Sequence, residues 1–256
     1  MLKSLRYLSV LIFAFVLAAC YEVNEDVVVN ENGGGVFESR MDMGKLLDLA
    51  QAFIGDEEVT SSGLDRPMDT VISMQSIIDS ADEAQRAKIA WMKDGKVALK
   101  LNMKEKLLKI DVRIPYQNAG QLEQLMESQG TIMNNTMTGL WKSDQKPANN
   151  SNPDDAGMSD LVGVYDVKIA NGLISRKVDT VKFKEFMLKP MVSDLKKMIE
   201  QGIEITYTTN FKLPRIVKNV TNPLLKVSDD KRTVTLKYNL LEIVNDPAKF
   251  AYSIEY

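Results

Sequence analysis

The chain has 256 residues, of which 32 are basic and 35 acidic, with no histidine and a single cysteine. Without histidine it cannot form a Ser-His-Asp triad or the imidazole sites that zinc, copper and non-haem iron prefer. Its slight negative charge makes nucleic acid an unsuitable partner, because phosphate backbones select clustered Lys and Arg. A hydrophobic content of 45% is ordinary for a globular core. We expect a folded protein without a metal site or cofactor.

The first twenty residues have the layout of a secretory signal peptide. Two basic residues precede a predominantly apolar run, Leu8 to Ala19. That run has about a dozen residues, whereas a helix needs roughly 20 to cross a bilayer core. Its end, Leu-Ala-Ala-Cys at positions 17–20, resembles the lipobox of bacterial lipoproteins. The resemblance implies that residues 1–19 are removed and that the thiol of Cys20 is acylated.

Acylation would determine where the protein resides. Each buried methylene contributes about 0.8 kcal/mol, so two or three acyl chains on Cys20 would attach the chain stably to a membrane of the bacterial cell envelope. Tyr21 rather than aspartate follows the cysteine, and similarity to a common Gram-negative sorting rule implies the outer membrane, facing the periplasm. The alternative is the cell surface, because some bacteria use acidic residues after the cysteine as an export tag, here Glu22, Glu25 and Asp26.

The N-terminal half, expected over residues 20–140, combines a hairpin, helices and alternating strands. Glycines at 33–35 separate two valine-containing runs and predict a β-hairpin. Alternation of apolar and polar residues predicts antiparallel strands over 96–103 and 108–114. Apolar residues three and four apart predict helices over 44–54, over Thr70–Ala84 after an Asp69 cap, and over Gln121–Gln129.

The C-terminal half, expected over residues 161–256, follows a polar stretch at 141–160 that we interpret as a flexible loop or linker. Asn171-Gly172 is the strongest hairpin signal in the chain. A helical face extends from Phe183 to Ile199, and Pro190 should divide it. Strands are predicted over Ile203–Leu213, Leu224–Val227, Thr233–Ile243 and Phe250–Tyr256.

These elements predict an α+β fold in which curved antiparallel sheets have helices packed on one face. Each half contains a hairpin, then a helix, then further strands. The order therefore allows two similar halves, forming one domain or two.

Part of the chain resembles LppM-type lipoproteins. In both, a strand follows the lipidated cysteine directly and leads into a turn, here Asn32 with its glycines. The Phe-Lys-Leu-Pro segment at 211–214, the stretch Asn219–Asn222 and the strand Thr233–Leu241 are similar to the late segment of that family. Arg215 stands where the family has glycine. The resemblance implies a curved sheet with a lipid or glycolipid cavity.

Two predicted helices supply the candidate wall of an apolar ligand site. Methionine is abundant, with 14 residues, and its flexible side chain suits variable apolar ligands. If both helices pack on one face of the sheet, the wall would consist of Met74, Ile78, Met187 and Met191. The alternative is that these residues are filled core, which is the more common use of methionine at helical spacing.

Other residues are weaker candidates for a site. Asn152, Asp154, Asp155 and Asp160 offer oxygen ligands to Ca²⁺, but their spacing departs from an EF-hand and favours a solvated loop. The same interpretation applies to the acidic residues Asp56, Glu57 and Glu58. Aromatic side chains that stack on a sugar or enter a lipid interface are the alternative to ordinary packing for Trp91 and Trp141.

Two classes of function remain. The preferred one is a membrane-anchored, non-enzymatic envelope lipoprotein that binds an apolar or amphipathic ligand or a protein partner. The alternative is a carboxylate-dependent hydrolase acting on envelope glycans, which needs two carboxyl groups about 5 to 9 Å apart. An apolar pocket without converging acids would favour the first class.

Overall fold

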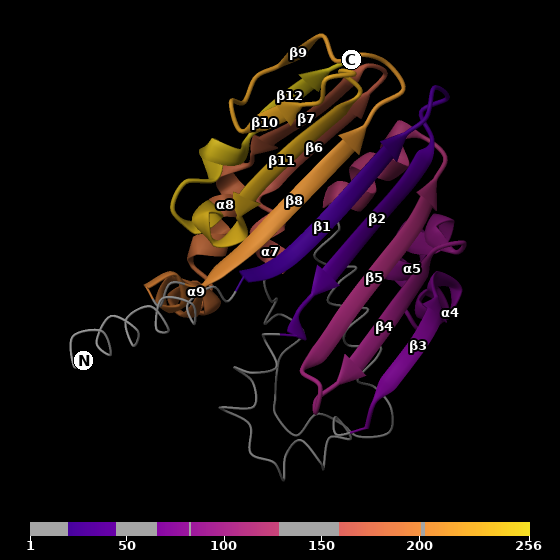
Figure 1. The fold of residues 1–256 in the computed structure, drawn as a ribbon, viewed down its shortest axis with the longest axis vertical. Helices are drawn as coiled ribbons and strands as arrows, with labels where there is room; N and C mark the ends of the chain where they lie inside the picture. Colours follow the sequence, from indigo (N-terminus) through magenta and orange to yellow (C-terminus); the bar gives the residue numbers. More distant parts are fainter. Residues whose placement is uncertain (1–19, 45–65, 82, 128–158, 201–202) are drawn as a thin grey trace, which may run out of the picture.

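Two β-sheets and the helices beside them form the part of the chain that the computed structural model describes, residues 20–44, 66–81, 83–127, 159–200 and 203–256 (Figure 1). The larger sheet has the strand order β10-β11-β8-β1-β2-β5-β4-β3, and the smaller has the order β6-β7-β12-β9. Among the described strands, every pair is antiparallel except β1 with β8. The expected α+β class with antiparallel sheets is confirmed.

The eight-stranded sheet contains strands from both halves of the chain. Its strands are β1 (Cys20–Val29), β2 (Gly35–Asp42), β3 (Met68–Ser73), β4 (Lys96–Asn102), β5 (Leu107–Tyr116), β8 (Glu204–Lys212), β10 (Leu225–Val227) and β11 (Thr233–Asn239). The parallel pair of β1 and β8 joins the N-terminal strands to the C-terminal ones. The residues on either side of the 141–160 segment therefore share one continuous sheet.

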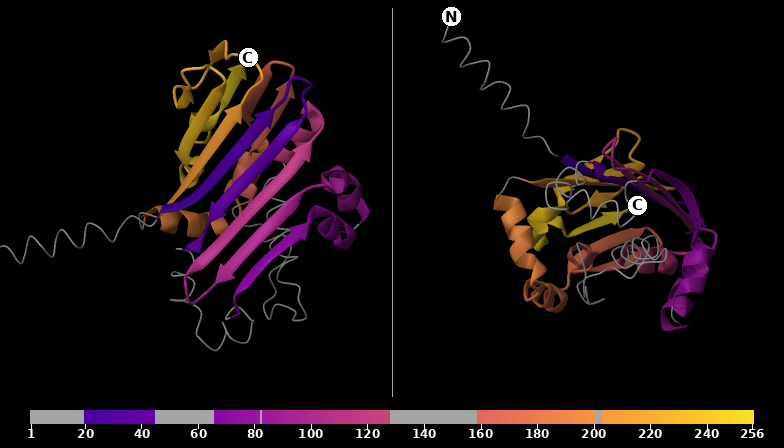
Figure 2. Two further views of the ribbon diagram at one scale, coloured as in Figure 1. Left: turned by 45° about the vertical axis from the view of Figure 1, so that its right-hand side comes forward. Right: turned by 90° about the horizontal axis from the view of Figure 1, so that it is seen from below.

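The four-stranded sheet and the helices lie on the concave side of the curved larger sheet (Figure 2). The strands of the smaller sheet are β6 (Tyr165–Ala170), β7 (Leu173–Val178), β9 (Asn219–Val220) and β12 (Tyr252–Glu255). The helices are α4 (Met74–Ser80), α5 (Glu83–Ile89), α7 (Ser159–Val162), α8 (Thr180–Met187) and α9 (Met191–Glu200). Residues 119–127 are also helical, and short 3-10 helices are η1 (Ala90–Met92), η2 (Leu240–Val244) and η3 (Pro247–Phe250).

Local turn chemistry was sufficient to place several boundaries. Both predicted hairpins form, and Gly33 and Gly172 have φ values of +81° and +84°, which favour glycine. The long helical face divides at Pro190 into α8 and α9, as predicted. The helix predicted over 44–54 and most of the 141–160 loop lie outside the described residues.

The prediction of a helix over Thr70–Ala84 is wrong at its start. Residues 70–73 belong to the edge strand β3, which pairs with β4. Backbone pairing along the sheet edge thus overrides the helical spacing of the apolar residues. The helix begins at Met74, and its cap is Ser73 rather than Asp69, because Ser73 Oγ accepts a hydrogen bond from Ser76 N at 3.3 Å.

The strand predicted over Thr233–Ile243 is also too long. It ends at Asn239, where the side-chain oxygen accepts a hydrogen bond from Leu241 N at 3.1 Å and starts η2. A side chain that bonds to the backbone two residues on competes with the ladder of a sheet. The same oxygen accepts a hydrogen bond from Ile205 N at 3.1 Å, so this turn is joined to the start of β8.

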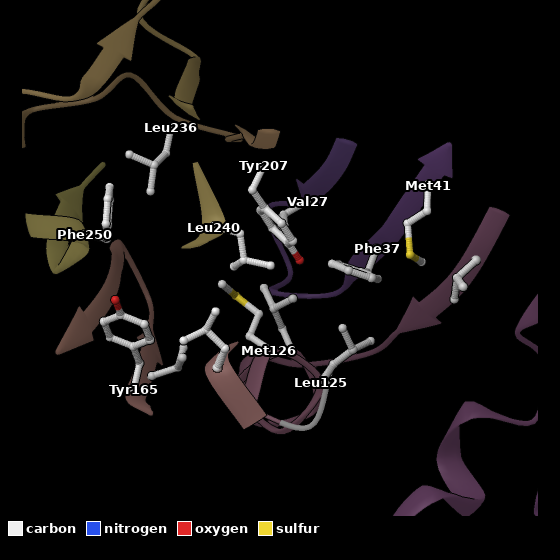
Figure 3. Packing of buried hydrophobic residues seen from close by; sticks show 14 of the residues in the cluster. Val27, Phe37, Met41, Leu125, Met126, Tyr165, Tyr207, Leu236, Leu240 and Phe250 are labelled. Carbon is white, nitrogen blue, oxygen red and sulfur yellow. The ribbon is translucent and has the colours of Figure 1, made fainter. Parts of the chain in front are cut away.

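Alternate residues of the large sheet point to its concave side, which the small sheet and the helices cover. Val27, Ile110, Phe211 and Val234 are completely buried there. Figure 3 shows Val27, Phe37 and Tyr207 gathered with Leu125 and Met126 of the 119–127 helix. Tyr165 and Phe250 lie at the left of the same view. A fully buried side chain of this size contributes about 1.5 to 3 kcal/mol, so this layer supplies most of the stability of the fold.

Two adjacent acids specify the register of β1 on β8. Glu25 points between the sheets, where its carboxylate accepts hydrogen bonds from the Tyr207 hydroxyl and from Thr209 Oγ1, the latter at 3.1 Å. Asp26 lies on the opposite face of the sheet and accepts a hydrogen bond from Asn210 Nδ2 at 3.0 Å. Because side chains alternate between faces, a slip by one residue would move each acid away from its donors.

Asp26 also belongs to a polar ladder on the outer face of the sheet. It accepts a hydrogen bond from Arg40 Nη2 at 2.7 Å and lies 3.4 Å from Lys212 Nζ. Burial raises the pKa of Asp26, but the hydrogen bonds from Arg40 and Asn210 and the charge of Lys212 outweigh it, so the pKa is lowered. Folding therefore favours the ionised carboxylate.

Asp26→Asn should destabilise the protein by about 1 kcal/mol at neutral pH, since charge-assisted hydrogen bonds are lost. Because the pKa of Asp26 is depressed in the folded state, this contribution is complete above the usual carboxyl pKa of 3.8 and is lost as the pH falls through the lowered value. Denaturant unfolding at pH 7 and at pH 3 measures the difference. Asp111→Asn, the same change at an exposed site of β5, is the control, and an equal effect of both variants would contradict the prediction.

Candidate functional site

Strand β1 runs from Cys20, the predicted acylation site, to the predicted hairpin turn at 30–34. It begins at Cys20, which pairs with Glu204, and ends at Val29. At roughly 3.3 Å per residue, its ten residues span about 30 Å. The turn at 30–34 follows directly, at the end of the sheet farthest from Cys20 (Figure 1).

A pocket of about 230 Å³ lies at that far end. It is formed by the β1–β2 turn, the β6–β7 turn, the 119–127 helix, the chain after β8 and the last residue of the sequence. Its buried apolar floor consists of Val29, Leu122, Ile169 and Tyr256. Its rim is polar and exposed, with Asn30, Glu31, Asn32, Asn171 and Arg215.

Both turns at the pocket are held by specific hydrogen bonds. In the first turn, Asn32 Oδ1 accepts a hydrogen bond from Gly34 N at 3.0 Å. In the second, Tyr256 N donates to the carbonyl of Gly172 at 3.0 Å. A Cβ atom at Gly172 would lie 2.8 Å from the Tyr256 carbonyl and 3.1 Å from Arg215 Nη2, so glycine is required for both its φ and the close approach.

Arg215 is fixed in place by the second turn. Its Nη2 donates to Asn171 Oδ1 at 2.6 Å, and its guanidinium carbon lies 5.3 Å from the centre of the Tyr256 ring. Burial raises the pKa of Tyr256, and Arg215 and the backbone of Gly172 oppose part of that rise. The phenol is therefore neutral at physiological pH and can donate or accept a hydrogen bond.

The helix at 119–127 closes one side of the pocket. Asn118 Oδ1 accepts a hydrogen bond from Gln121 N at 3.0 Å and so caps the first turn. Glu123 Oε2 accepts a hydrogen bond from Ile169 N at 2.7 Å, which satisfies a donor on the edge of β6. This bond covers an edge that would otherwise be open for pairing.

The structure does not bring the four residues of the predicted ligand wall together. Met74 and Ile78 are 1% and 3% exposed on α4, which follows the edge strand β3. Met187 and Met191 are half-buried on α8 and α9, at the opposite flank of the large sheet (Figure 1). Helical spacing in the sequence correctly indicates an apolar face in each helix but contains no information on which part of the sheet that face covers.

The remaining sequence candidates do not form a site in the described residues. Trp91 is half-buried and donates from Nε1 to Gln124 Oε1 at 3.0 Å, as expected for a packed side chain. Within the described ranges, no group of three or more His, Cys, Asp or Glu side chains is placed to bind a metal. The structure leaves undescribed Trp141, the acidic residues 56–58 and Asn152, Asp154 and Asp155.

Arg176 of β7 is a cation buried between the two sheets. The guanidinium carbon of Arg176 lies 3.9 Å from the ring centre of Tyr165 and 5.5 and 5.6 Å from those of Tyr238 and Tyr252. Nη1 donates to the Tyr238 hydroxyl at 3.4 Å. Nε and Nη2 have no hydrogen-bond partner among the described residues. Nothing in the sequence pattern of β7 had indicated a cation facing the core.

The tyrosines around Arg176 connect it to Glu25. Burial lowers the pKa of Arg176 but the surrounding tyrosines raise it, so the guanidinium remains charged. Burial raises the pKa of Tyr165 to about 12. Burial has the largest effect on Tyr238 and raises its pKa. The charge of Arg176 lowers this pKa and the charge of Glu25 raises it, so Tyr238 interacts with both charged residues. We interpret this cluster as a structural link between the two sheets, because both charged residues are almost fully buried.

Comparisons with known proteins give no relative. No family model, no curated protein and no solved structure matches the chain. Among the described residues, no helix combines the length and the apolar character needed to span a bilayer.

Proposed function

We propose that the chain is an acylated, non-enzymatic lipoprotein of the bacterial cell envelope that binds a small amphipathic ligand in the pocket beside Arg215. The lipobox at 17–20 supports the anchor, and the resemblance to LppM-type lipoproteins agrees with it. The polar rim and apolar floor of the pocket support an amphipathic ligand, because such sites combine apolar walls with a few polar groups that orient the ligand.

The observation that carries this proposal is that one strand joins the anchor to the pocket. β1 starts at Cys20 itself, so no flexible spacer separates the acylated residue from the central sheet. Val29, the last residue of β1, belongs to the pocket floor. With acyl chains in the membrane, β1 would hold the pocket about 30 Å from the point of attachment, where it opens to the aqueous phase.

The volume of the pocket limits the size of the ligand. A cavity of about 150 Å³ holds a benzene molecule, so 230 Å³ has room for about ten non-hydrogen atoms. The ligand is therefore a small molecule or the terminal group of a larger one.

The geometry of the pocket does not favour the hydrolase alternative. Glycoside hydrolysis uses a pair of carboxyl groups that flank the scissile bond. Among the described residues that line the pocket, Glu31 is the one acid. Glu25 is 3% exposed and bonded between the sheets.

Replacing the acylated residue tests the anchor. Cys20→Ser should abolish incorporation of radiolabelled palmitate and leave the protein uncleaved or soluble, because the serine hydroxyl does not form the thioether. Membrane fractionation and autoradiography of cells that express either form provide the measurement. Equal labelling of wild type and variant would exclude acylation at this position.

Filling the pocket tests ligand binding. Ala119→Trp places an indole at the pocket wall, so a ligand that co-purifies with the wild type should be lost. Native mass spectrometry of the full chain, released gently from the host membrane, detects the ligand as a mass difference. Ala87→Trp, at an exposed site of α5, is the matched control and should keep it. An unchanged adduct in Ala119→Trp would place the ligand elsewhere.

A further inference from the structure

Hydrogen-bond donors dominate the polar rim of the pocket. The side-chain oxygens of Asn32 and Asn171 are both occupied within the protein, by Gly34 N at 3.0 Å and by Arg215 Nη2 at 2.6 Å. An amide whose oxygen is engaged in this way offers mainly its NH₂ group to a ligand. Both side chains are exposed at the rim, so two amide donors accompany the guanidinium there.

Arg215 is oriented before any ligand arrives. Asn171 holds one of its terminal nitrogens, and the Tyr256 ring lies beneath the guanidinium at 5.3 Å. A planar guanidinium has five donors in a fixed fork that matches a carboxylate or a phosphate. Among the described residues, the only hydrogen bond of this guanidinium is the one from Nη2 to Asn171, so the remaining donors of the fork can serve a ligand.

The charges near the rim favour an anion with a single negative charge. Arg215 lines the pocket, and Lys218 Nζ donates to the Tyr256 carbonyl at 3.3 Å beside it. Glu31 is exposed at the same rim and would repel a second negative charge. Beneath the rim, Val29, Ile169 and Tyr256 line the pocket and keep a small exposed apolar surface, which suits an apolar group.

From this arrangement we infer that the ligand is a small organic carboxylate, with the carboxylate bound by Arg215 and the amides of Asn32 and Asn171, and the apolar body on Ile169 and Tyr256. This inference rests on the proposed function and specifies its ligand class. A phosphate monoester at neutral pH would bring close to two negative charges to a site whose described lining holds one cation, Arg215, and one acid, Glu31. A carboxylate brings one.

The test uses the full acylated chain in nanodiscs, with empty nanodiscs as background. The probes are phenylpropionate, its neutral amide phenylpropanamide, and phenethyl phosphate, and ligand-observed NMR titration gives each affinity. Phenylpropionate should bind about tenfold or more tightly than the amide, since a hydrogen-bonded charge is lost. It should also bind more tightly than the phosphate.

Variants assign the preference to the named residues. Arg215→Gln should weaken phenylpropionate binding about 10- to 100-fold and leave the amide unchanged. Asn171→Asp, which is isosteric but places a carboxylate next to Arg215, should weaken it similarly, whereas Glu31→Gln should strengthen it. Lys226→Gln removes the same charge at an exposed site of β10, outside the pocket lining, and should have no effect. Thermal unfolding checks that every variant is folded.

Four results would contradict the carboxylate inference. Equal binding of acid and amide, tighter binding of the phosphate, or full retention of phenylpropionate binding by Arg215→Gln would overturn the inference. So would the absence of binding by all three probes. None of these results affects the proposed function, which depends on palmitate labelling and on the adduct lost in Ala119→Trp.

Discussion

The parallel pairing of β1 with β8 is the constraint on which the rest of the structure depends. It joins strands about 180 residues apart, and two neighbouring acids on β1 specify it from opposite faces of the sheet. Glu25 is satisfied by hydroxyl groups between the sheets and Asp26 by polar partners on the outer face. A shift in register would leave a carboxylate in the core without donors, at a cost of several kcal/mol. The pair therefore excludes neighbouring registers more effectively than the valines of β1, which would pack in several.

Further features of the fold follow from this pairing. The Glu25 carboxylate shares its tyrosine neighbours with Arg176 of β7. The residues that align β1 on β8 therefore also connect the large sheet to the small one. With β1 central and the two sheets joined, the β1–β2 turn lies beside the β6–β7 turn and the chain after β8. The pocket is thus a consequence of long-range pairing, and its residues come from five separate parts of the sequence. The anchor proposed at Cys20 belongs to the same strand as the pocket floor.

Short-range chemistry explains which features were predictable. Asn-Gly and Gly-rich segments predicted both hairpins because those turns need φ values that glycine adopts freely, and Pro190 predicted the division of a helix because proline lacks a donor. Thr70–Ser73 was misassigned because its apolar spacing suits a helix while its backbone is engaged by β4. The ligand wall of Met74 with Met187 could not be judged, since the relative position of two helices depends on strand order. The sequence identified Asn32 and Asn171 as turn residues and Arg215 as a departure from the LppM pattern. It contained no information that these three residues lie together, because their proximity depends on the strand topology.

The distance of the pocket from the membrane tests most directly the claim that one rigid strand joins anchor and site. Cys20 is the only cysteine of the chain and would be occupied by lipid, so a single added cysteine can be labelled selectively. One spin label is attached at Glu31→Cys, on the pocket rim, and another, in a separate variant, at Asp42→Cys, which is level with Glu22 near the start of β1. Pulsed EPR in nanodiscs measures the distance of each label from spin-labelled lipid headgroups. A rigid β1 predicts short distances for the label at 42 and a narrow distribution about 25 Å farther from the membrane for the label at 31, because seven residues of β1 and part of the turn separate their levels. Equal distances for the two labels, or a broad distribution for the label at 31 that reaches the bilayer surface, would contradict it.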